Sequence, residues 1–185
     1  MKLEFQPLTP QRWDDVAALF GARGACGGCW CMYWKLPRAQ FTRCKGAGNR
    51  RAFRRIVKSG RVPGILAYAA GTPVGWCAVE PRAAYPALAR SRVLAPVDEQ
   101  PVWSVTCFYV ARGWRRKGVT VQLLRAAVQH VRQRGGRIIE GYPVLPKPYH
   151  TSSVAFAWTG FAAAFEAAGF RDCAVRSRPI MRRRA

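Results

Sequence analysis

The stretch FYVARGWRRKGVTVQLL, residues 108–124, decides the fold of this chain. It begins with apolar, strand-forming residues and ends with apolar residues at helical spacing. Two glycines and four cations lie between these parts: Gly113, Gly118, Arg112, Arg115, Arg116 and Lys117. The first N–H groups of a helix have no internal partner, and they lie at the positive end of its dipole. The stretch therefore predicts a phosphate or pyrophosphate site, with a solvated basic loop as the alternative.

The segments on both sides of this stretch read as further strands and helices. Strands are predicted near residues 3–5, in a hairpin over 65–79, and over 102–110, 137–144 and 173–181. Helices are predicted over 10–20, 119–134 and 155–168, and from a cap at Asn49 to Gly60, while 81–100 reads as a connection. The predicted fold is α/β, one domain over residues 1–185 with a central mixed sheet flanked by helices.

The overall composition indicates a globular protein. The chain has 185 residues, of which 50% are hydrophobic, enough for a packed core. No run approaches the roughly 20 apolar residues of a membrane span. The N-terminus lacks the pattern of a signal peptide, so a cytoplasmic protein with seven reduced cysteines is expected.

The charge is strongly positive. There are 31 Lys and Arg against nine Asp and Glu, a formal net charge of +22. Such a field attracts polyanions, for example nucleic acid, anionic lipid or a phosphorylated cofactor. Arg greatly outnumbers Lys, so a biased genome composition is an equally good explanation of the excess charge.

The basic loop resembles the acetyl-CoA motif of the GNAT acetyltransferases, Arg/Gln-x-x-Gly-x-Gly/Ala after a strand. Here it reads Arg115-Arg116-Lys117-Gly118-Val119-Thr120, with Val110 closing the strand and Thr120 in place of the small last residue. A second signature of that family is similar to FEAAGF, residues 165–170, and the order of elements is similar along the whole chain. The segments CWCMYW, PVGWCAVEPR, WSVTCFYV and EGYP together resemble a bacterial group of this family.

The resemblance implies an enzyme that uses acetyl-CoA to acetylate an amine by direct attack, without a covalent enzyme intermediate. In that interpretation the backbone of the strand pairs with the pantetheine arm and the loop holds the phosphates. The implied CoA-binding residues are Phe108, Tyr109, Val110, Arg112, Arg115, Arg116, Lys117, Gly118, Val119 and Thr120.

The catalytic residues depart from the family's pattern. Phe165 stands where a tyrosine acid is usual, so either Tyr142, Tyr149 or water protonates the leaving thiolate, or the thiolate leaves unassisted. The strand before the loop has no carboxylate, so Glu140 is the predicted base and Glu80 the second choice. A structural ion pair with arginine is the alternative role for Glu140. Of the two histidines, His130 is expected at the surface, and His150 is expected in a loop, exposed to solvent, with a place beside the acceptor as the alternative.

The segment CGGCWCMYWK, residues 26–35, has three readings. Cys26, Cys29, Cys31 and Cys44 are possible zinc ligands, but they do not form two separated pairs, and no metal is predicted. The resemblance places the segment over the acceptor end of the cleft, with Trp30, Tyr33 and Trp34 as substrate-binding residues. Trp30 and Trp34 are one helical turn apart and are expected to share a face. Core packing of these rings is the equal alternative.

The acceptor is not specified by the sequence. The positive field disfavours polycations, so a small or anionic amine, or an amino acid derivative, is expected. A nucleic-acid-binding protein is the alternative function, although the basic residues are spread along the chain. The oligomeric state is left open, and a dimer is compatible with the sequence.

Overall fold

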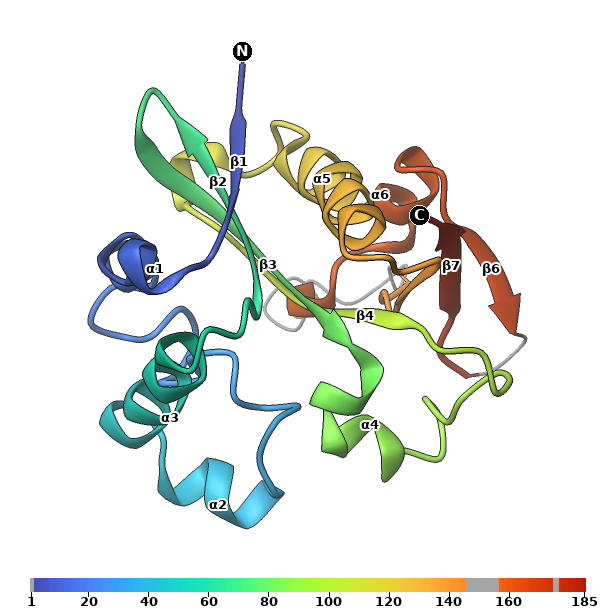
Figure 1. Ribbon diagram of the computed structural model, residues 1–185, viewed down its shortest axis with the longest axis horizontal. Coiled ribbons are helices and arrows are strands. Elements are labelled where there is room, and N and C mark those ends of the chain that lie inside the picture. The colour runs from blue at the N-terminus through green and yellow to red at the C-terminus, as the bar shows by residue number, and fades with distance from the viewer. Residues whose placement is uncertain (1, 146–156, 175–176) are drawn as a thin grey trace.

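In the computed structural model, which describes residues 2–145, 157–174 and 177–185, one mixed sheet of seven strands crosses the molecule (Figure 1). The strand order is β1-β2-β3-β4-β5-β7-β6, and the neighbours are antiparallel except for the parallel pair β4 and β5. The strands are β1 Glu4–Pro7, β2 Gly64–Ala69, β3 Thr72–Pro81, β4 Trp103–Val110, β5 Ile138–Gly141, β6 Arg171–Ala174 and β7 Ile180–Arg184.

Helices cover both faces of the sheet (Figure 1). They are α1 Trp13–Phe20, α2 Arg38–Arg43, α3 Ala47–Lys58, α4 Pro86–Ala89, α5 Val119–Gln133 and α6 Ala162–Ala167, with 3₁₀ turns η1 Pro10–Arg12, η2 Arg82–Ala84 and η3 Arg112–Trp114. Apolar side chains of α5 and α6 pack on one face, and those of α1 and α3 pack on the other. Within the described residues, no helix is both long and apolar enough to cross a membrane.

The strand β4 contributes to both cores because its side chains alternate between the two faces. Val105 and Phe108 pack with α5 and α6, whereas Cys107 and Tyr109 pack with α1 and α3. The register of β4 against β3 shifts between Val105 and Cys107, which leaves Thr106 as an extra residue in β4. A bulge of this kind bends a strand and turns its side chains locally.

The sequence predicted the central elements correctly. The α/β fold with a mixed sheet is confirmed, as are the hairpin β2–β3, the strand β4 and the helix α5. Gly21 ends α1 with a left-handed φ of 63°, as its position in the sequence predicts.

Several predicted boundaries were wrong. Asn49 does not cap α3 but lies inside it, buried, where its side-chain amide donates to the carbonyls of Gly28 and Phe41. The single strand predicted over 173–181 is an antiparallel pair, β6 and β7. The last helix begins at Ala162 in the described residues. The helix α4 lies in the segment 81–100 that was read as a connection, and α2 lies where no element was predicted.

Of the two histidines, the structure describes His130. His130 was expected at the surface, but it is buried on α5 against the ring of Trp103. Burial, with a smaller contribution from Arg134, lowers the pKa of His130 to about 4, so the ring is neutral near pH 7. His150 and Tyr149 lie outside the described residues.

Candidate active site

The strands β4 and β5 pair over only three positions. Trp103–Val105 lies beside Ile139–Gly141, where β5 ends. The strand β4 continues to Val110 with β3 as its partner, and the bulge at Thr106 marks the point where β4 leaves β5. Within the described part of the chain, the other edge of β4 beyond this point pairs with no strand.

Backbone hydrogen bonds show which residues face the open edge. The Ala111 N–H donates to the carbonyl oxygen of Val74, on the β3 side, at 3.0 Å. Because antiparallel residues alternate in direction, Tyr109 also faces β3, whereas Phe108 and Val110 face the open edge. The Val110 carbonyl accepts a bond of 3.0 Å from Nε of Arg115. The open edge therefore offers main-chain donors and acceptors to an extended ligand.

The open edge leads into the loop before α5. Arg116 and Gly118 both have left-handed φ, at 59° and 72°. The N–H of Gln122 donates to the Gly118 carbonyl at the start of α5, so the N–H groups of the first helical turn have no intrahelical partner. Four exposed cations surround them: Arg112, Arg115, Arg116 and Lys117. This is the geometry and charge of a phosphate site.

The predicted base, Glu140, lies in a buried ion-pair network. One carboxylate oxygen accepts from Arg82 at 3.0 Å and from the Tyr142 hydroxyl at 2.6 Å, and the other accepts from Arg182 at 2.7 Å. The Tyr142 hydroxyl also contacts Ser104 at 2.8 Å. Burial, followed by the charge of Glu140, raises the pKa of Tyr142. These contacts favour the ion-pair role that the sequence left as the alternative for Glu140.

The second predicted base, Glu80, is also held between two cations. Its carboxylate bonds Lys35 and Arg61. Lys35 is itself buried, and its ammonium lies 4.2 Å from the centre of the Tyr85 ring. Burial lowers the pKa of Lys35, and the nearby Glu80 charge opposes that effect.

Tyr85 is a candidate that the sequence did not reveal. It lies in the segment that was read as a connection, where nothing in the residue pattern distinguishes it. The side chain is fully buried, and its hydroxyl has no hydrogen-bond partner of good geometry among the described residues. Burial raises the pKa of Tyr85 well above its ordinary value, as does the charge of Glu80, while the hydroxyl of Thr106 at the bulge opposes the rise. A protonated donor therefore lies near the point where β4 leaves β5.

The three aromatic residues predicted to contact substrate separate into two groups. Tyr33 and Trp34 contact each other and Trp158, with ring centroids 5.0–5.8 Å apart. Trp34 Nε1 is buried without a partner in the described residues. Trp30 instead packs in the core against Trp13 and Phe20. Trp30 and Cys31 have left-handed φ, so the segment is not helical, and the predicted shared face of Trp30 and Trp34 was wrong.

The four cysteines considered for zinc do not gather at one point. Cys31 is buried and its sulfur accepts a hydrogen bond from Nε1 of Trp76 at 3.1 Å. Burial, followed by the interaction with Cys31, raises the pKa of Cys29 to about 12, which favours the neutral thiol over the thiolate that binds metal. Among the described residues, no group of three or more Cys, His, Asp or Glu side chains is arranged to hold a metal ion.

Comparison with known proteins identifies the family. A model of the acetyltransferase (GNAT) family matches residues 30–145, more than half of the chain. The chain belongs to the GNAT acetyltransferase family. It is therefore an acetyltransferase, and acetyl-CoA is its co-substrate. A search of curated proteins gave no match to this acetyltransferase.

Solved structures show the same fold. A GNAT acetyltransferase from Streptococcus agalactiae 2603 aligns with a TM-score of 0.58 and 13% identity, over 99% of this chain and 95% of that chain. The aminoglycoside N-acetyltransferase AAC(6')-Iy, in complex with CoA, aligns at 0.56 and 16%, over 94% and 91%. The PaiA N-acetyltransferase from Thermoplasma acidophilum, in complex with coenzyme A, aligns at 0.52 and 12%, over 100% of both chains. At these identities the likeness is one of fold.

The Glu140 network predicts a stability effect. Glu140→Gln removes a carboxylate that is 1% exposed and leaves Arg82 and Arg182 without their buried partner. We expect the free energy of unfolding to fall by about 3–5 kcal/mol, measured by urea denaturation. Asp98→Asn removes the exposed partner of Arg182 and should have a much smaller effect. Equal losses in the two variants would contradict a buried network centred on Glu140.

Proposed function

We propose that this acetyltransferase passes the acetyl group of acetyl-CoA directly to an amine, at the place where β4 leaves β5. The observation that carries this proposal is the continuity of the unpaired edge of β4 with the basic N-terminus of α5. The unpaired edge of β4 can hydrogen-bond an extended arm that contains amides, and the N-terminus of α5 can bind a pyrophosphate. No covalent enzyme intermediate is required, because a single site holds thioester and acceptor together.

In this proposal different residues bind different parts of CoA. The main-chain groups of Phe108 and Val110 pair with the pantetheine arm, whereas Tyr109 faces β3 and contributes packing. The N–H groups of Val119 and Thr120 bind the pyrophosphate. The remaining contributors are the left-handed Gly118, which keeps the approach open, and the cations Arg112, Arg115, Arg116 and Lys117, which add charge.

The thioester would then lie near Thr106, where Tyr85 supplies a donor. The amine nitrogen attacks the thioester carbonyl carbon and the carbon–sulfur bond breaks. The thiolate takes the proton of the Tyr85 hydroxyl, and the proton that the amine loses returns to Tyr85 through water in the site. Glu140 and Glu80 are each held between two cations, so we assign them to positioning, and Tyr142 with them.

The acceptor that fits best is a small or anionic amine, such as an amino acid derivative. The aromatic group of Tyr33, Trp34 and Trp158 lies on the same face of the sheet as Glu80 and Glu140. Its unpartnered donor, Trp34 Nε1, suits a carboxylate or carbonyl oxygen. Both buried acids on this face are already paired with cations, so they offer little to a polycation.

The proposal predicts a defined pattern of substrates. We expect CoA to raise the melting temperature in a thermal-shift titration, since a ligand that binds only the folded state stabilises it. A thiol-release screen over amines should then show faster turnover of amino acid derivatives than of polyamines. Faster turnover of polyamines would contradict the acceptor class, and thiol release that needs no amine would contradict direct transfer.

The proposed phosphate site at the start of α5 can be tested at Gly118. Gly118→Val places a branched side chain at a φ of 72°, where no neighbouring atom clashes with a Cβ but a phosphate must approach. We expect the Kd for CoA to rise at least about tenfold, measured by calorimetry, from the loss of close main-chain contacts. Gly113→Val is the matched control, because its site is open and its φ is not left-handed. Unchanged CoA affinity in Gly118→Val would contradict a phosphate site at the start of α5.

The role of Tyr85 can be separated from its packing. Tyr85→Phe removes only a buried hydroxyl that has no hydrogen-bond partner of good geometry in the described residues, so stability should change little. We expect kcat to fall roughly tenfold to a hundredfold, with little change in the Kd for CoA. Tyr142→Phe, which removes a hydroxyl inside the Glu140 network, should instead lower stability. An unchanged kcat in Tyr85→Phe would exclude the hydroxyl as the proton donor.

A further inference from the structure

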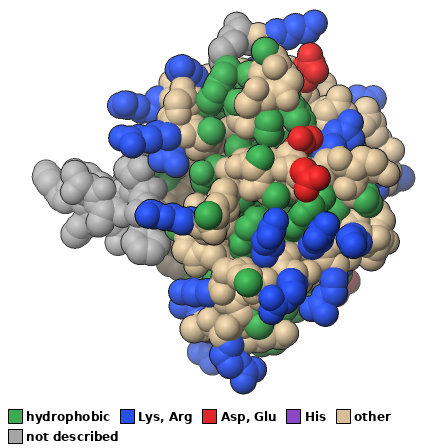
Figure 2. All heavy atoms as spheres, turned by 90° about the vertical axis from the view of Figure 1, so that its left-hand side faces the viewer, with side chains coloured by type: hydrophobic (Ala, Val, Ile, Leu, Met, Phe, Trp, Pro, Cys, Tyr) green, Lys and Arg blue, Asp and Glu red, His purple; other side chains and the backbone are tan. Residues whose placement is uncertain are grey.

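The helix α3 carries a basic surface that acetyl transfer does not use. Residues 16–79 hold eleven Lys and Arg and no Asp or Glu. Five of these cations lie on α3, and all five are exposed: Arg50, Arg51, Arg54, Arg55 and Lys58. Figure 2 shows this side of the molecule, with Lys and Arg side chains gathered over its lower part, on the side where α2 and α3 lie in Figure 1.

The five cations form two adjacent rows along one side of the helix. Arg50, Arg54 and Lys58 are spaced four residues apart, as are Arg51 and Arg55. Like charges at this spacing repel one another and weaken a helix. The helix nevertheless forms, because its opposite side buries Phe53 and Val57 completely. An anion lying across both rows would relieve the repulsion.

Two of the guanidinium groups are held in place by aromatic rings. Arg50 lies 5.4 Å from the ring centre of Trp30, and Arg54 lies 5.5 Å from that of Trp13. Such contacts reduce the side-chain entropy lost on binding. All nine acidic residues of the chain are in the described residues, and none of them forms an ion pair with α3. The positive charge of this helix is therefore not neutralised within the chain.

We propose that α3 docks the phosphate backbone of a nucleic acid. From Arg50 to Lys58 the helix rises about 12 Å. Measured along the duplex axis, where each strand has one phosphate about every 3.4 Å, that length corresponds to about three or four phosphates of one strand. Four of the five cations are arginines, whose planar groups bind two phosphate oxygens at once. Cations that contact phosphates position a protein on the duplex without reading its sequence, so the binding is expected to be sequence-independent.

The apolar residues of α3 argue against a membrane surface as the partner. A helix that lies in a membrane interface needs an apolar face free to enter it. The apolar side of α3 is already buried in the core through Phe53 and Val57. In the described part of the chain, the exposed large hydrophobic residues are Val93 and Leu145, and neither is on α3.

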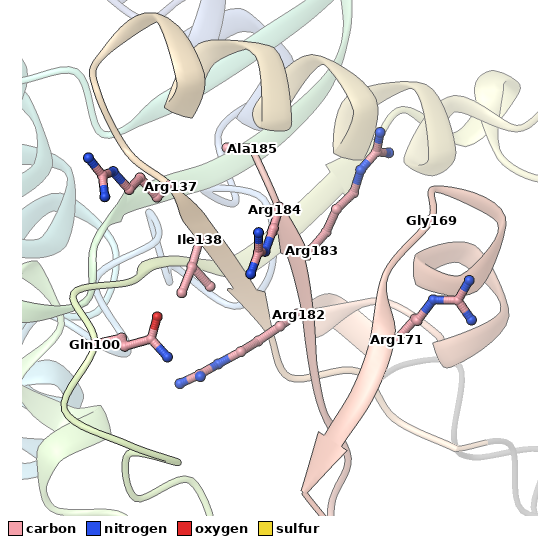
Figure 3. A pocket seen from close by; sticks show the side chains of 9 residues that line it. All are labelled: Gln100, Arg137, Ile138, Gly169, Arg171, Arg182, Arg183, Arg184 and Ala185. Carbon is pink, nitrogen blue, oxygen red and sulfur yellow. The ribbon is translucent and has the colours of Figure 1, made fainter.

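A second basic surface provides a matched control. A groove of about 810 Å³ at the β5–β7–β6 end of the sheet is lined by Arg137, Arg171, Arg182, Arg183 and Arg184 (Figure 3). Arg182 is engaged by Glu140 and Asp98, and Arg183 donates to the Ala168 carbonyl. Arg137 and Arg171 point to opposite sides in Figure 3. The guanidinium groups of this groove that are unpaired within the described residues therefore do not lie side by side in rows, as the cations of α3 do.

The experiment compares two double variants with the same change of charge. Arg51→Gln/Arg55→Gln alters α3, and Arg137→Gln/Arg184→Gln alters the groove. All four side chains are exposed and without a hydrogen bond or ion pair in the described residues. Binding of a labelled DNA duplex of about two helical turns is measured by fluorescence anisotropy over a range of salt concentrations. Stabilisation by CoA in both variants confirms that each is folded.

We expect the α3 variant to raise the Kd for the duplex about tenfold and to reduce the slope of log K against log salt by about two. The groove variant should change the Kd by less than about twofold, because it alters only the general field. Equal weakening in both variants, or greater weakening in the groove variant, would overturn the proposal. So would α3-dependent binding to anionic lipid vesicles that exceeds binding to the duplex.

Discussion

The parting of β4 from β5 is the constraint on which the rest of the site depends. Three paired positions hold the strands together, and the bulge at Thr106 then carries β4 away while β3 continues to pair with it. If β5 had continued to pair with β4, the backbone N–H and C=O groups on that edge of β4 would have bonded to β5. Because the pairing stops, that edge offers unpaired backbone groups in line with the positive end of α5. The site that we propose for the co-substrate thus depends on backbone geometry more than on particular side chains.

Charge pairing links the strands that surround the point of parting. Glu140 on β5 joins Arg82, which follows β3, and Arg182 on β7, while Glu80 on β3 joins Lys35 and Arg61. Two of the nine acids thus hold four cations across the face that carries the aromatic group. A buried network contributes specificity of position more than net stability, because desolvation offsets much of its attraction. We infer that it fixes how β3, β5 and β7 meet.

Sequence patterns revealed the elements whose signals are local. The strand β4, the helix α5 and the basic loop between them combine periodicity, glycine and charge within a few residues. The ion pairs of Glu140 and the buried hydroxyl of Tyr85 depend on segments far apart in the chain, so no local pattern contains them. Trp30 and Cys31 show a different limit. Their left-handed φ is imposed by packing, against the preference of both residue types.

The uneven distribution of charge links the two proposals. The acids that pair across the sheet lie at Glu80 and beyond, whereas residues 16–79 have none. Glu80 pairs with Lys35 and Arg61, and within the described residues the cations of α2 and α3 form no ion pair with any of the nine acids. The positive field of these two helices lies on the face of the sheet where Tyr33 and Trp34, which we assign to the acceptor, also lie. It would raise the local concentration of anionic molecules on this side and lower that of polycations. An anionic acceptor, the class that we propose, would therefore reach this face more often than a polycation of similar size.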